Sequence, residues 1–255
     1  MKLRLHQFLS KCGVFSSKNE VKQAIWDGDI TIGDRVAKDM KFQFNPANKE
    51  VRFRGELLTL PNSNSYFLLN KPAGVICSRL NQQEKKLGKK SVYDIFRAHV
   101  SNEVYETLVT VGRLDEDTTG FLLVTTDGDV VHKITSPKHH ISKTYRVTCS
   151  KKVTGGDVQK LKSGVEVTFE ESGITESYQA RPAHVERISS NEVLLTINEG
   201  KKRQIRRMFS SLGNEVTQLH RVSTENMALE DYKLKQGEFC SIDSQEIDQL
   251  ILFEQ

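Results

Sequence analysis

The sequence lacks the features that mark membrane and secreted proteins. No apolar run approaches the ~18 residues that a membrane span requires, and charged residues interrupt the apolar positions near the N-terminus. We therefore expect no signal peptide, no membrane helix and, by default, a cytoplasmic location. The 37% hydrophobic and 27% charged residues are typical of a soluble globular protein.

Cysteine is scarce as well. The chain has four cysteines, which lie far apart and form no CxxC pair: Cys12, Cys77, Cys149 and Cys240. This spacing argues against a disulfide framework and against a zinc site. We expect buried, reduced thiols and no bound metal.

Positive charge is distributed unevenly along the chain. Residues 1–60 hold 11 Lys and Arg against 7 Asp and Glu, whereas residues 61–255 hold 26 of each kind. The whole excess of +4 therefore lies in the N-terminal quarter. This pattern indicates a small basic module attached to a neutral body.

The N-terminal quarter predicts two helices followed by short strands. Apolar residues at i, i+3, i+4 and i+7 share one face of a first helix, which Gly13 can end. These residues are Leu5, Phe8, Leu9 and Cys12. A second helix starts at Ser17, where Ser17 and Glu20 have capping-box spacing, and ends at Gly28. Short strands are expected at 30–32, 35–36 and 51–54.

A polar, proline-containing segment separates this module from the rest of the chain. We predict a first domain at 1–60, a linker at 61–65 and a second domain at 66–255. Expected strands are 66–70, 108–111, 121–125, 145–149 and 193–197, expected helices are 92–98, 204–212 and 245–253, and 80–90 is expected to be a surface loop. Without a regular βαβ rhythm, an α+β fold with a mainly antiparallel sheet is favoured.

The segment 111–120 places an acidic turn between two apolar strands. Its sequence VGRLDEDTTG puts Asp115 on a short connection at a sheet end, where functional groups concentrate. A solvated acidic turn explains the same residues. Asp115 and Asp117 also suggest a two-carboxylate pair of the glycosidase kind, although spacing in sequence does not set their separation in space.

Two basic stretches follow this turn in the sequence. In EGKKRQIRRMF (199–209), five cations within seven positions indicate contact with phosphate or RNA, while a basic surface helix is the plainer alternative. In the segment 136–146, further cations lie beside Tyr145. Metal binding by His139 and His140 is not expected, because adjacent residues on an extended chain point to opposite sides.

Taken together, four segments resemble one family. GRLDEDTTGFLLVTTDGD, the preceding LNKPAG (69–74), the following KTY (143–145) and EGKKRQIRRMF resemble the pseudouridine synthases of the small-subunit rRNA type. Residues 1–60 resemble the S4-type RNA-binding module of these enzymes. The resemblance implies a small S4-like αα-β module followed by a catalytic domain with a mainly antiparallel mixed sheet. ITSPKHH, DTTG and LHR (219–221) resemble members that act on 16S rRNA.

The resemblance also implies roles for individual residues. Asp115 is expected to be the catalytic aspartate, Tyr145 the aromatic residue against the target base, and Arg206 the cation that pairs with Asp115. Arg206 would keep this carboxylate charged beneath a bound base. Expected RNA contacts are Lys71, Arg113, Lys143, Lys201, Lys202, Arg203, Arg207 and Arg221 in the catalytic domain, and Arg4, Lys18 and Lys22 in the S4-like module.

The implied reaction isomerises a specific uridine of rRNA to pseudouridine and needs no cofactor. The expected partner is ribosomal RNA or a pre-ribosomal small-subunit particle, bound by a monomer. A synthase acting on large-subunit rRNA and a non-catalytic S4-type assembly protein remain alternatives. A base or sugar hydrolase would keep the aspartate but release free uracil.

Overall fold

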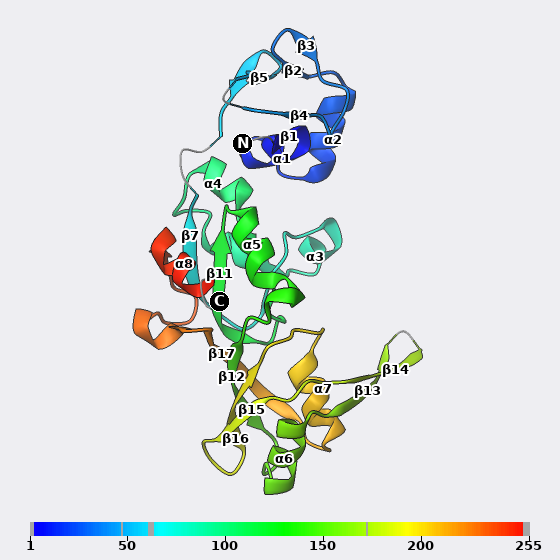
Figure 1. Ribbon diagram of the computed structural model, residues 1–255, viewed down its shortest axis with the longest axis vertical. Helices are drawn as coiled ribbons and strands as arrows, with labels where there is room; N and C mark the ends of the chain where they lie inside the picture. Colours follow the sequence, from blue (N-terminus) through cyan, green and yellow to red (C-terminus); the bar gives the residue numbers. More distant parts are fainter. Residues whose placement is uncertain (1–2, 47, 61–63, 172, 252–255) are drawn as a thin grey trace. The chain divides into compact units, whose positions relative to one another are not determined.

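The computed structural model describes residues 3–46, 48–60, 64–171 and 173–251, which form two compact units (Figure 1). The first unit combines residues up to 65 with 93–109 and 125–127, and the second holds 66–92, 110–124 and the chain from 128 onward. The segment 93–109 thus groups with the N-terminal residues. Residues 61–63 of the expected linker lie outside the described residues, and the domain boundaries stay a prediction.

Both predicted N-terminal helices are present in the first unit. After the short strand β1 (Leu3–Arg4) come α1 (Leu5–Lys11) and α2 (Lys18–Trp26). Ser17 caps α2, because its hydroxyl accepts a hydrogen bond from the Glu20 amide at 3.2 Å. The apolar faces of both helices are buried in one core cluster, which includes Leu5, Phe8, Leu9, Val21, Ala24 and Ile25.

Short strands complete the first unit. The antiparallel order β3-β2-β5-β6 is built from β2 (Ile30–Ile32), β3 (Arg35–Val36), β5 (Val51–Phe53) and β6 (Glu56–Leu58), while β4 (Gln43–Phe44) pairs with β1. The segment 93–109 adds most of η1 (Val92–Ile95) and the helix α4 (Asn102–Thr107). Gly13, at φ +71°, lies against the Glu103 backbone, where a Cβ atom would come within 2.6 Å. A side chain at position 13 would therefore push α4 away.

Within the described residues, a nine-stranded mixed sheet forms the body of the second unit. Its central order is β15-β16-β12-β17-β11-β7-β19, with β10 paired to β11 and β18 to β17. The strands are β7 (Tyr66–Lys71), β10 (Val109–Thr110), β11 (Thr119–Thr125), β12 (Lys143–Cys149), β15 (His184–Arg187), β16 (Glu192–Ile197), β17 (Val216–Thr224), β18 (Met227–Ala228) and β19 (Phe239–Ile242). Antiparallel pairs predominate and β11 runs parallel to β17. The predicted α+β class with a mainly antiparallel mixed sheet is confirmed.

A glycine permits the central parallel pairing. Gly120 of β11 lies opposite Arg221 of β17 at φ +103°, and a Cβ atom there would meet the Arg221 carbonyl oxygen at 2.2 Å. Only glycine fits so close to a neighbouring backbone. The final glycine of the GRLDEDTTG turn therefore fixes the spacing of β11 and β17, the strands that flank the site described below.

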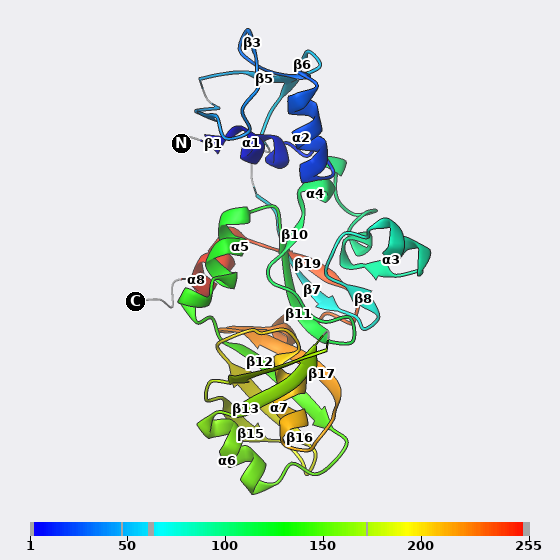
Figure 2. The same ribbon diagram turned by 90° about the vertical axis from the view of Figure 1, so that its right-hand side faces the viewer.

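Helices cover the sheet at two places. α5 (Gly128–Thr135) packs beside α8 (Ser244–Ile251), as Figure 2 shows, and buries Val130, Ile134, Ile247 and Leu250 with residues of β7 and β11. Elsewhere α6 (Gly155–Ser163) packs against β15, and α7 (Gln204–Ser211) packs against the hairpin of β13 (Glu166–Glu171) and β14 (Ile174–Gln179). Besides the helix within residues 80–90 described next, the second unit also contains β8 (Val75–Ile76), β9 (Lys90–Ser91), η2 (Pro137–His139) and η3 (Leu229–Tyr232).

The expected surface loop at 80–90 is partly wrong, because it contains the helix α3 (Gln82–Lys86). Asn81 and Glu84 form a capping box that starts this helix, with both hydrogen bonds at 2.8 Å. None of its residues is buried, so the sequence has no apolar stripe that would predict this helix. Among the described residues, no helix is long and apolar enough to cross a membrane.

Candidate active site

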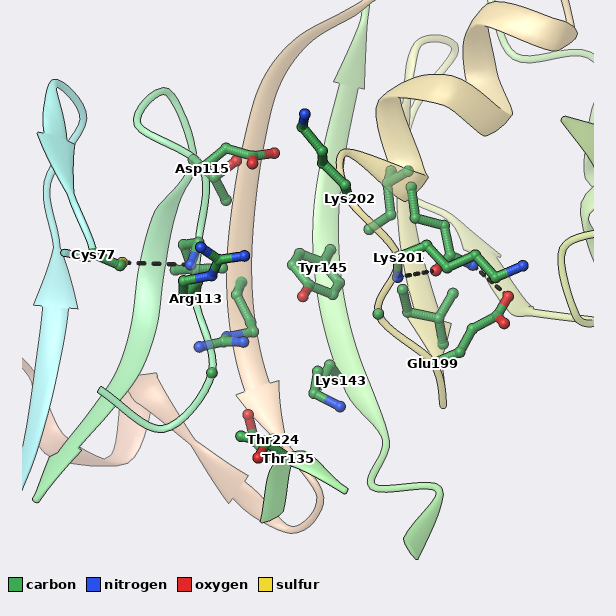
Figure 3. Close-up of a pocket in the computed structure, with 18 of the residues that line it drawn as sticks. Cys77, Arg113, Asp115, Thr135, Lys143, Tyr145, Glu199, Lys201, Lys202 and Thr224 are labelled. Atoms are coloured by element: carbon green, nitrogen blue, oxygen red, sulfur yellow. Dashed lines mark hydrogen bonds between the residues drawn. The ribbon is translucent and has the colours of Figure 1, made fainter. Parts of the chain in front are cut away.

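A cavity of about 820 Å³ in the second unit collects most of the expected functional side chains. Its walls include the end of β8, residues 111–116 and 118 of the acidic turn, the first half of β12, part of β17, and the 197–205 segment that leads into α7. Figure 3 shows Arg113, Asp115, Lys143, Tyr145 and Lys202 around this space. Segments far apart in the sequence thus meet over the middle of the sheet.

The turn between β10 and β11 presents Asp115. Gly112 adopts φ +74°, which allows the chain to turn sharply after β10. The amide of Thr118 donates to the carbonyl of Asp115 at 3.1 Å and closes the turn. The half-buried Asp115 carboxylate lines the cavity and, among the described residues, takes part in no ion pair. This carboxylate is therefore open to a bound substrate.

Lys71 holds the acidic turn from beneath. Its side chain is fully buried at the end of β7, and its Nζ donates to the carbonyls of Pro72 (3.1 Å), Asp115 (3.1 Å), Glu116 (3.3 Å) and Thr118 (2.8 Å). Burial lowers the pKa of Lys71, while the neighbouring acids oppose this shift. Lys71 was expected to contact RNA. Since its ammonium is buried on four carbonyls, this expectation is corrected: in this structure Lys71 braces the loop.

Tyr145 and Arg221 face each other across two neighbouring strands. Tyr145 of β12 pairs in register with Arg221 of β17, at a point where the register shifts by a bulge. Both side chains are buried and line the cavity. The Nε of Arg221 donates to the Phe121 carbonyl at 2.6 Å. This bond, together with the packing at Gly120, orients the guanidinium within the cavity wall.

Lys143, on β12, is a second cation in the cavity wall. Its Nζ donates to the Ile141 carbonyl at 2.8 Å, and its side chain lines the same cavity. Burial and, to a lesser extent, the charge of Arg221 lower the pKa of Lys143 to about 8, with Glu225 opposing the shift. Lys143 therefore changes its charge close to neutral pH.

Arg206 pairs with Asp117 in this structure. One guanidinium nitrogen lies 3.0 Å from Asp117 Oδ2, and another donates to the Val216 carbonyl at 2.7 Å. Arg203 approaches the same carboxylate at 3.7 Å. The expected pair of Arg206 with Asp115 is therefore corrected for this structure. That expectation came from the family resemblance, whereas the partner in this structure is Asp117, two residues farther along the same turn.

The basic segment before and within α7 divides between two environments. Lys201, Lys202 and Arg203 line the cavity, whereas Arg207 stacks on Phe169 of β13 with 3.4 Å between its Cζ and the ring centroid. Lys201 also lies over the Tyr178 ring of β14 at 3.6 Å. The β13–β14 hairpin, which the sequence did not predict, thus orients two of the expected RNA-contact cations.

Four expected RNA contacts remain. Arg113 is exposed and lines the cavity. Arg4, Lys18 and Lys22 are exposed on the first unit, Arg4 directly before α1 and the two lysines on α2. All three are free of burial and thus accessible to solvent.

Two features of the site had no interpretation in the sequence. The Leu114 amide donates to Cys77 Sγ at 3.4 Å, so a buried thiol supports the residue before Asp115, and burial raises the pKa of this thiol. Lys89, after α3, pairs with Glu116 at 2.7 Å. The four cysteines are all free, as expected, although Cys240 is only half-buried. The sequence offered one hint that Cys77 takes part in the site: this cysteine directly follows the end of a strand.

Fold and cavity define an α+β protein whose cavity is lined by the Asp115 carboxylate, the rings of Phe121 and Tyr145, and several cations. The family comparison makes the class specific. The RNA pseudouridylate synthase family matches residues 65–211, and the chain belongs to this family. Its members are isomerases.

Relatives extend the similarity to almost the whole chain. The ribosomal small subunit pseudouridine synthase A of Haemophilus influenzae is 33% identical over 249 residues, which cover 98% of this chain and 100% of the relative. The uncharacterized RNA pseudouridine synthase YtzG of Bacillus subtilis is 33% identical over 250 residues, with 96% and 97% covered. A crystal structure of a pseudouridylate synthase is 34% identical, has a TM-score of 0.66, and covers 97% of this chain and 99% of its own.

Proposed function

We propose that the protein isomerises a specific uridine of small-subunit rRNA to pseudouridine. The observation that carries this proposal is the cavity that gathers the Asp115 carboxylate, the Tyr145 ring and the cations of Lys143 and Arg221. Its volume of about 820 Å³ lies within the range of small-molecule sites and suits a single nucleotide. The similarity to small-subunit relatives over nearly the full chain supports the choice of rRNA.

The reaction rearranges bonds without any net oxidation or reduction. The bond between uracil N1 and ribose C1′ breaks, the base turns within the site, and a bond forms between C5 and C1′. The proton on C5 leaves, and N1 holds a proton in the product. The atoms balance, so the chain's own residues need only hold the base and supply a carboxylate.

Asp115 is proposed to act at the ribose. An ionised carboxylate can attack C1′ as a nucleophile or remove a proton from the sugar as a base, and both routes need the same residue at the same place. Because the carboxylate has no ion-pair partner among the described residues, it is available for either route.

Tyr145 is proposed to lie against the target base. Removing a base from its stack costs roughly a few kcal/mol, and stacking on an aromatic ring returns ~1–3 kcal/mol. A ring fixed on β12 can therefore offset much of the unstacking cost. Its burial between β16 and β17 holds the ring in position before the RNA binds.

The cations are proposed to have two roles, binding of the RNA and positioning of the acidic turn. Arg113, Lys143, Lys202 and Arg221 would hold phosphates and the flipped nucleotide at the cavity, contributing affinity without reading sequence. Arg206, with Arg203, would hold Asp117 and so fix the turn that carries Asp115. In this arrangement Arg206 is a positioning residue.

The basic N-terminal residues are proposed to form an S4-type RNA-binding module at 1–60, joined by a linker at 61–65 to a catalytic domain at 66–255. Arg4, Lys18 and Lys22 are its proposed phosphate contacts. The natural partner would be rRNA or a pre-ribosomal small-subunit particle, bound by a monomeric enzyme.

Incubation with rRNA tests the proposal directly. Purified protein is mixed with small-subunit rRNA transcript, small-subunit particles and large-subunit rRNA, each labelled with tritium at C5 of uridine. Tritium release together with a mapped pseudouridine in the small-subunit samples is the expected result. The particle and the transcript show which form of the RNA is the substrate.

Three other outcomes would each replace the proposal. Pseudouridine found only in large-subunit rRNA would show that the substrate is the large-subunit rRNA instead. Free uracil without pseudouridine would make the protein a hydrolase. Tight RNA binding with neither product would make it an assembly protein.

A further inference from the structure

The first unit carries an aromatic side chain with no structural explanation. Trp26, the single tryptophan of the chain, is 65% exposed although tryptophan is among the residues most often buried on average. It ends α2, whose core face is formed by Val21, Ala24 and Ile25. Trp26 therefore adds little to the core of its own unit.

A cation lies over the exposed ring. The Nζ of Lys22, one helical turn before Trp26, is 4.2 Å from the ring centroid. Val36, itself 50% exposed, lies 3.6 Å from the position that a Cβ atom on Gly28 would take, two residues beyond Trp26. The end of α2 thus combines an open indole, a neighbouring ammonium and an exposed aliphatic side chain.

We infer that Trp26 and Lys22 form a binding site for an unpaired nucleobase of RNA, separate from the catalytic cavity. The indole would stack on the base, and the lysine would pair with the phosphate of the same nucleotide. Stacking on an aromatic ring tolerates every base, and an adjacent cation supplies the attraction for the backbone. The ligand is single-stranded RNA, for example a loop beside the modified position.

Charge favours RNA over an apolar protein segment as the occupant. The first sixty residues hold an excess of four positive charges, and Lys18 is also exposed on α2. An apolar partner would leave the Lys22 ammonium buried without a counter-charge, whereas a phosphate supplies one. The inference rests on the proposed function only in that the ligand is RNA.

The single tryptophan makes the test direct, because all indole fluorescence of the full-length protein comes from Trp26. Titration with a short oligouridylate should quench this emission saturably, and a fully paired RNA duplex should quench it far less. Emission of the free protein should report a water-exposed indole. A buried indole in the free protein, or saturated oligouridylate binding without quenching, overturns the inference.

Variants measure how much the site contributes. Trp26→Ala should weaken oligouridylate binding about 5- to 150-fold, the range expected for loss of one base stack, and Trp26→Phe should restore part of it. Lys22→Gln should lower the salt dependence of binding by about one unit of slope. Leu57→Ala is the matched control, since Leu57 is 49% exposed in the same unit and should bind as the wild type does.

Two further comparisons separate the possible failures. The Trp26→Ala variant could bind small-subunit particles weakly and deproteinised rRNA normally. This result would show that the site binds a ribosomal protein, and it would overturn the inference. Wild-type protein that makes pseudouridine without any change in fluorescence would refute this site and leave the proposed function intact. Quenching without pseudouridine formation would refute the function alone.

Discussion

Asp115 stands apart from the neighbouring acids because its carboxylate alone is open. Glu116 pairs with Lys89 and Asp117 with Arg206, so both have partners that compete with a substrate. Asp115 is the one of these three acids that has no ion-pair partner among the described residues and also lines the cavity.

Asp115→Asn should lower the single-turnover rate by roughly 10²–10⁴-fold or more, because the amide is neither nucleophile nor base. RNA affinity should stay within a few-fold, since the substitution leaves every phosphate-binding cation in place. Asp117→Asn, a matched neutralisation in the same turn, should retain more of the activity. Near-wild-type turnover of Asp115→Asn would refute its assignment.

The lowered pKa of Lys143 predicts that kcat/KM depends on pH. Its pKa is lowered to about 8, so the ammonium loses its proton, and its attraction for phosphate, as pH rises through that value. The kcat/KM of the free enzyme should therefore fall above pH about 8. Lys143→Arg keeps its charge over this range and should lose the decline. An identical decline in Lys143→Arg would assign the titration to another group.

Arg206 and Asp117 should behave as a coupled pair. Arg206→Met and Asp117→Asn should each lower kcat about tenfold or more, because a hydrogen bond to a charged group is worth ~1.5–3 kcal/mol. The double variant should be about as defective as the worse single variant. If Asp117→Asn is silent while Arg206→Met loses activity by orders of magnitude, Arg206 acts on Asp115 in the RNA complex, as the family resemblance implied.

At the scale of elements, the acidic turn depends on a strand that precedes it by over forty residues. Lys71 ends β7, and its ammonium binds carbonyls at both ends of the turn. An ammonium has three protons and here faces four carbonyls, so at least one proton is shared. The turn is therefore held by the sheet and not by its own residues alone.

Lys71→Met should loosen this turn while leaving the apolar packing in place. Each carbonyl left buried without a donor costs about 1–3 kcal/mol, so the midpoint of thermal unfolding should fall and kcat should fall with it. Lys89→Met, which removes the half-exposed partner of Glu116, should change both quantities less. A kcat loss equal in both variants would show that Lys71 has no special part in holding the turn.

At the scale of the whole molecule, the two units share one chain that crosses between them more than once. Residues 93–109 and 125–127 belong to the first unit, so it is not a simple N-terminal segment. Deleting residues 1–60 would uncover the backbone of Glu103, against which Gly13 packs. Substitution of surface charges is therefore the cleaner way to test the basic module.

Arg4→Gln and Lys18→Gln should weaken RNA binding and reduce its salt dependence by about one unit of slope for each phosphate that the variant no longer neutralises. Both side chains are exposed, so thermal stability should not change. Lys49→Gln, an exposed charge elsewhere in the same unit, is the control. An unchanged salt slope in the double variant would argue against docking through this face.

The sequence by itself determined the fold class and the functional segments. Apolar spacing predicted α1 and α2, alternation predicted β12, an apolar run predicted β16, and the resemblance of the GRLDEDTTG turn to a known family made Asp115 the expected catalytic residue. These signals are local, because helix and strand periods and turn chemistry depend on neighbouring residues. Two helices were not predicted in this way. The helix α3 has no apolar stripe, and α6 begins with two glycines, Gly155 and Gly156.

Only the tertiary structure decided which side chains meet. It paired Arg206 with Asp117, buried Lys71 beneath the turn, and set Arg207 against the unpredicted β13–β14 hairpin. Each contact joins residues far apart in sequence, and its geometry depends on strand order and register. Two carboxylates two residues apart look alike in a sequence, and only the packing of α7 against the sheet selects between them.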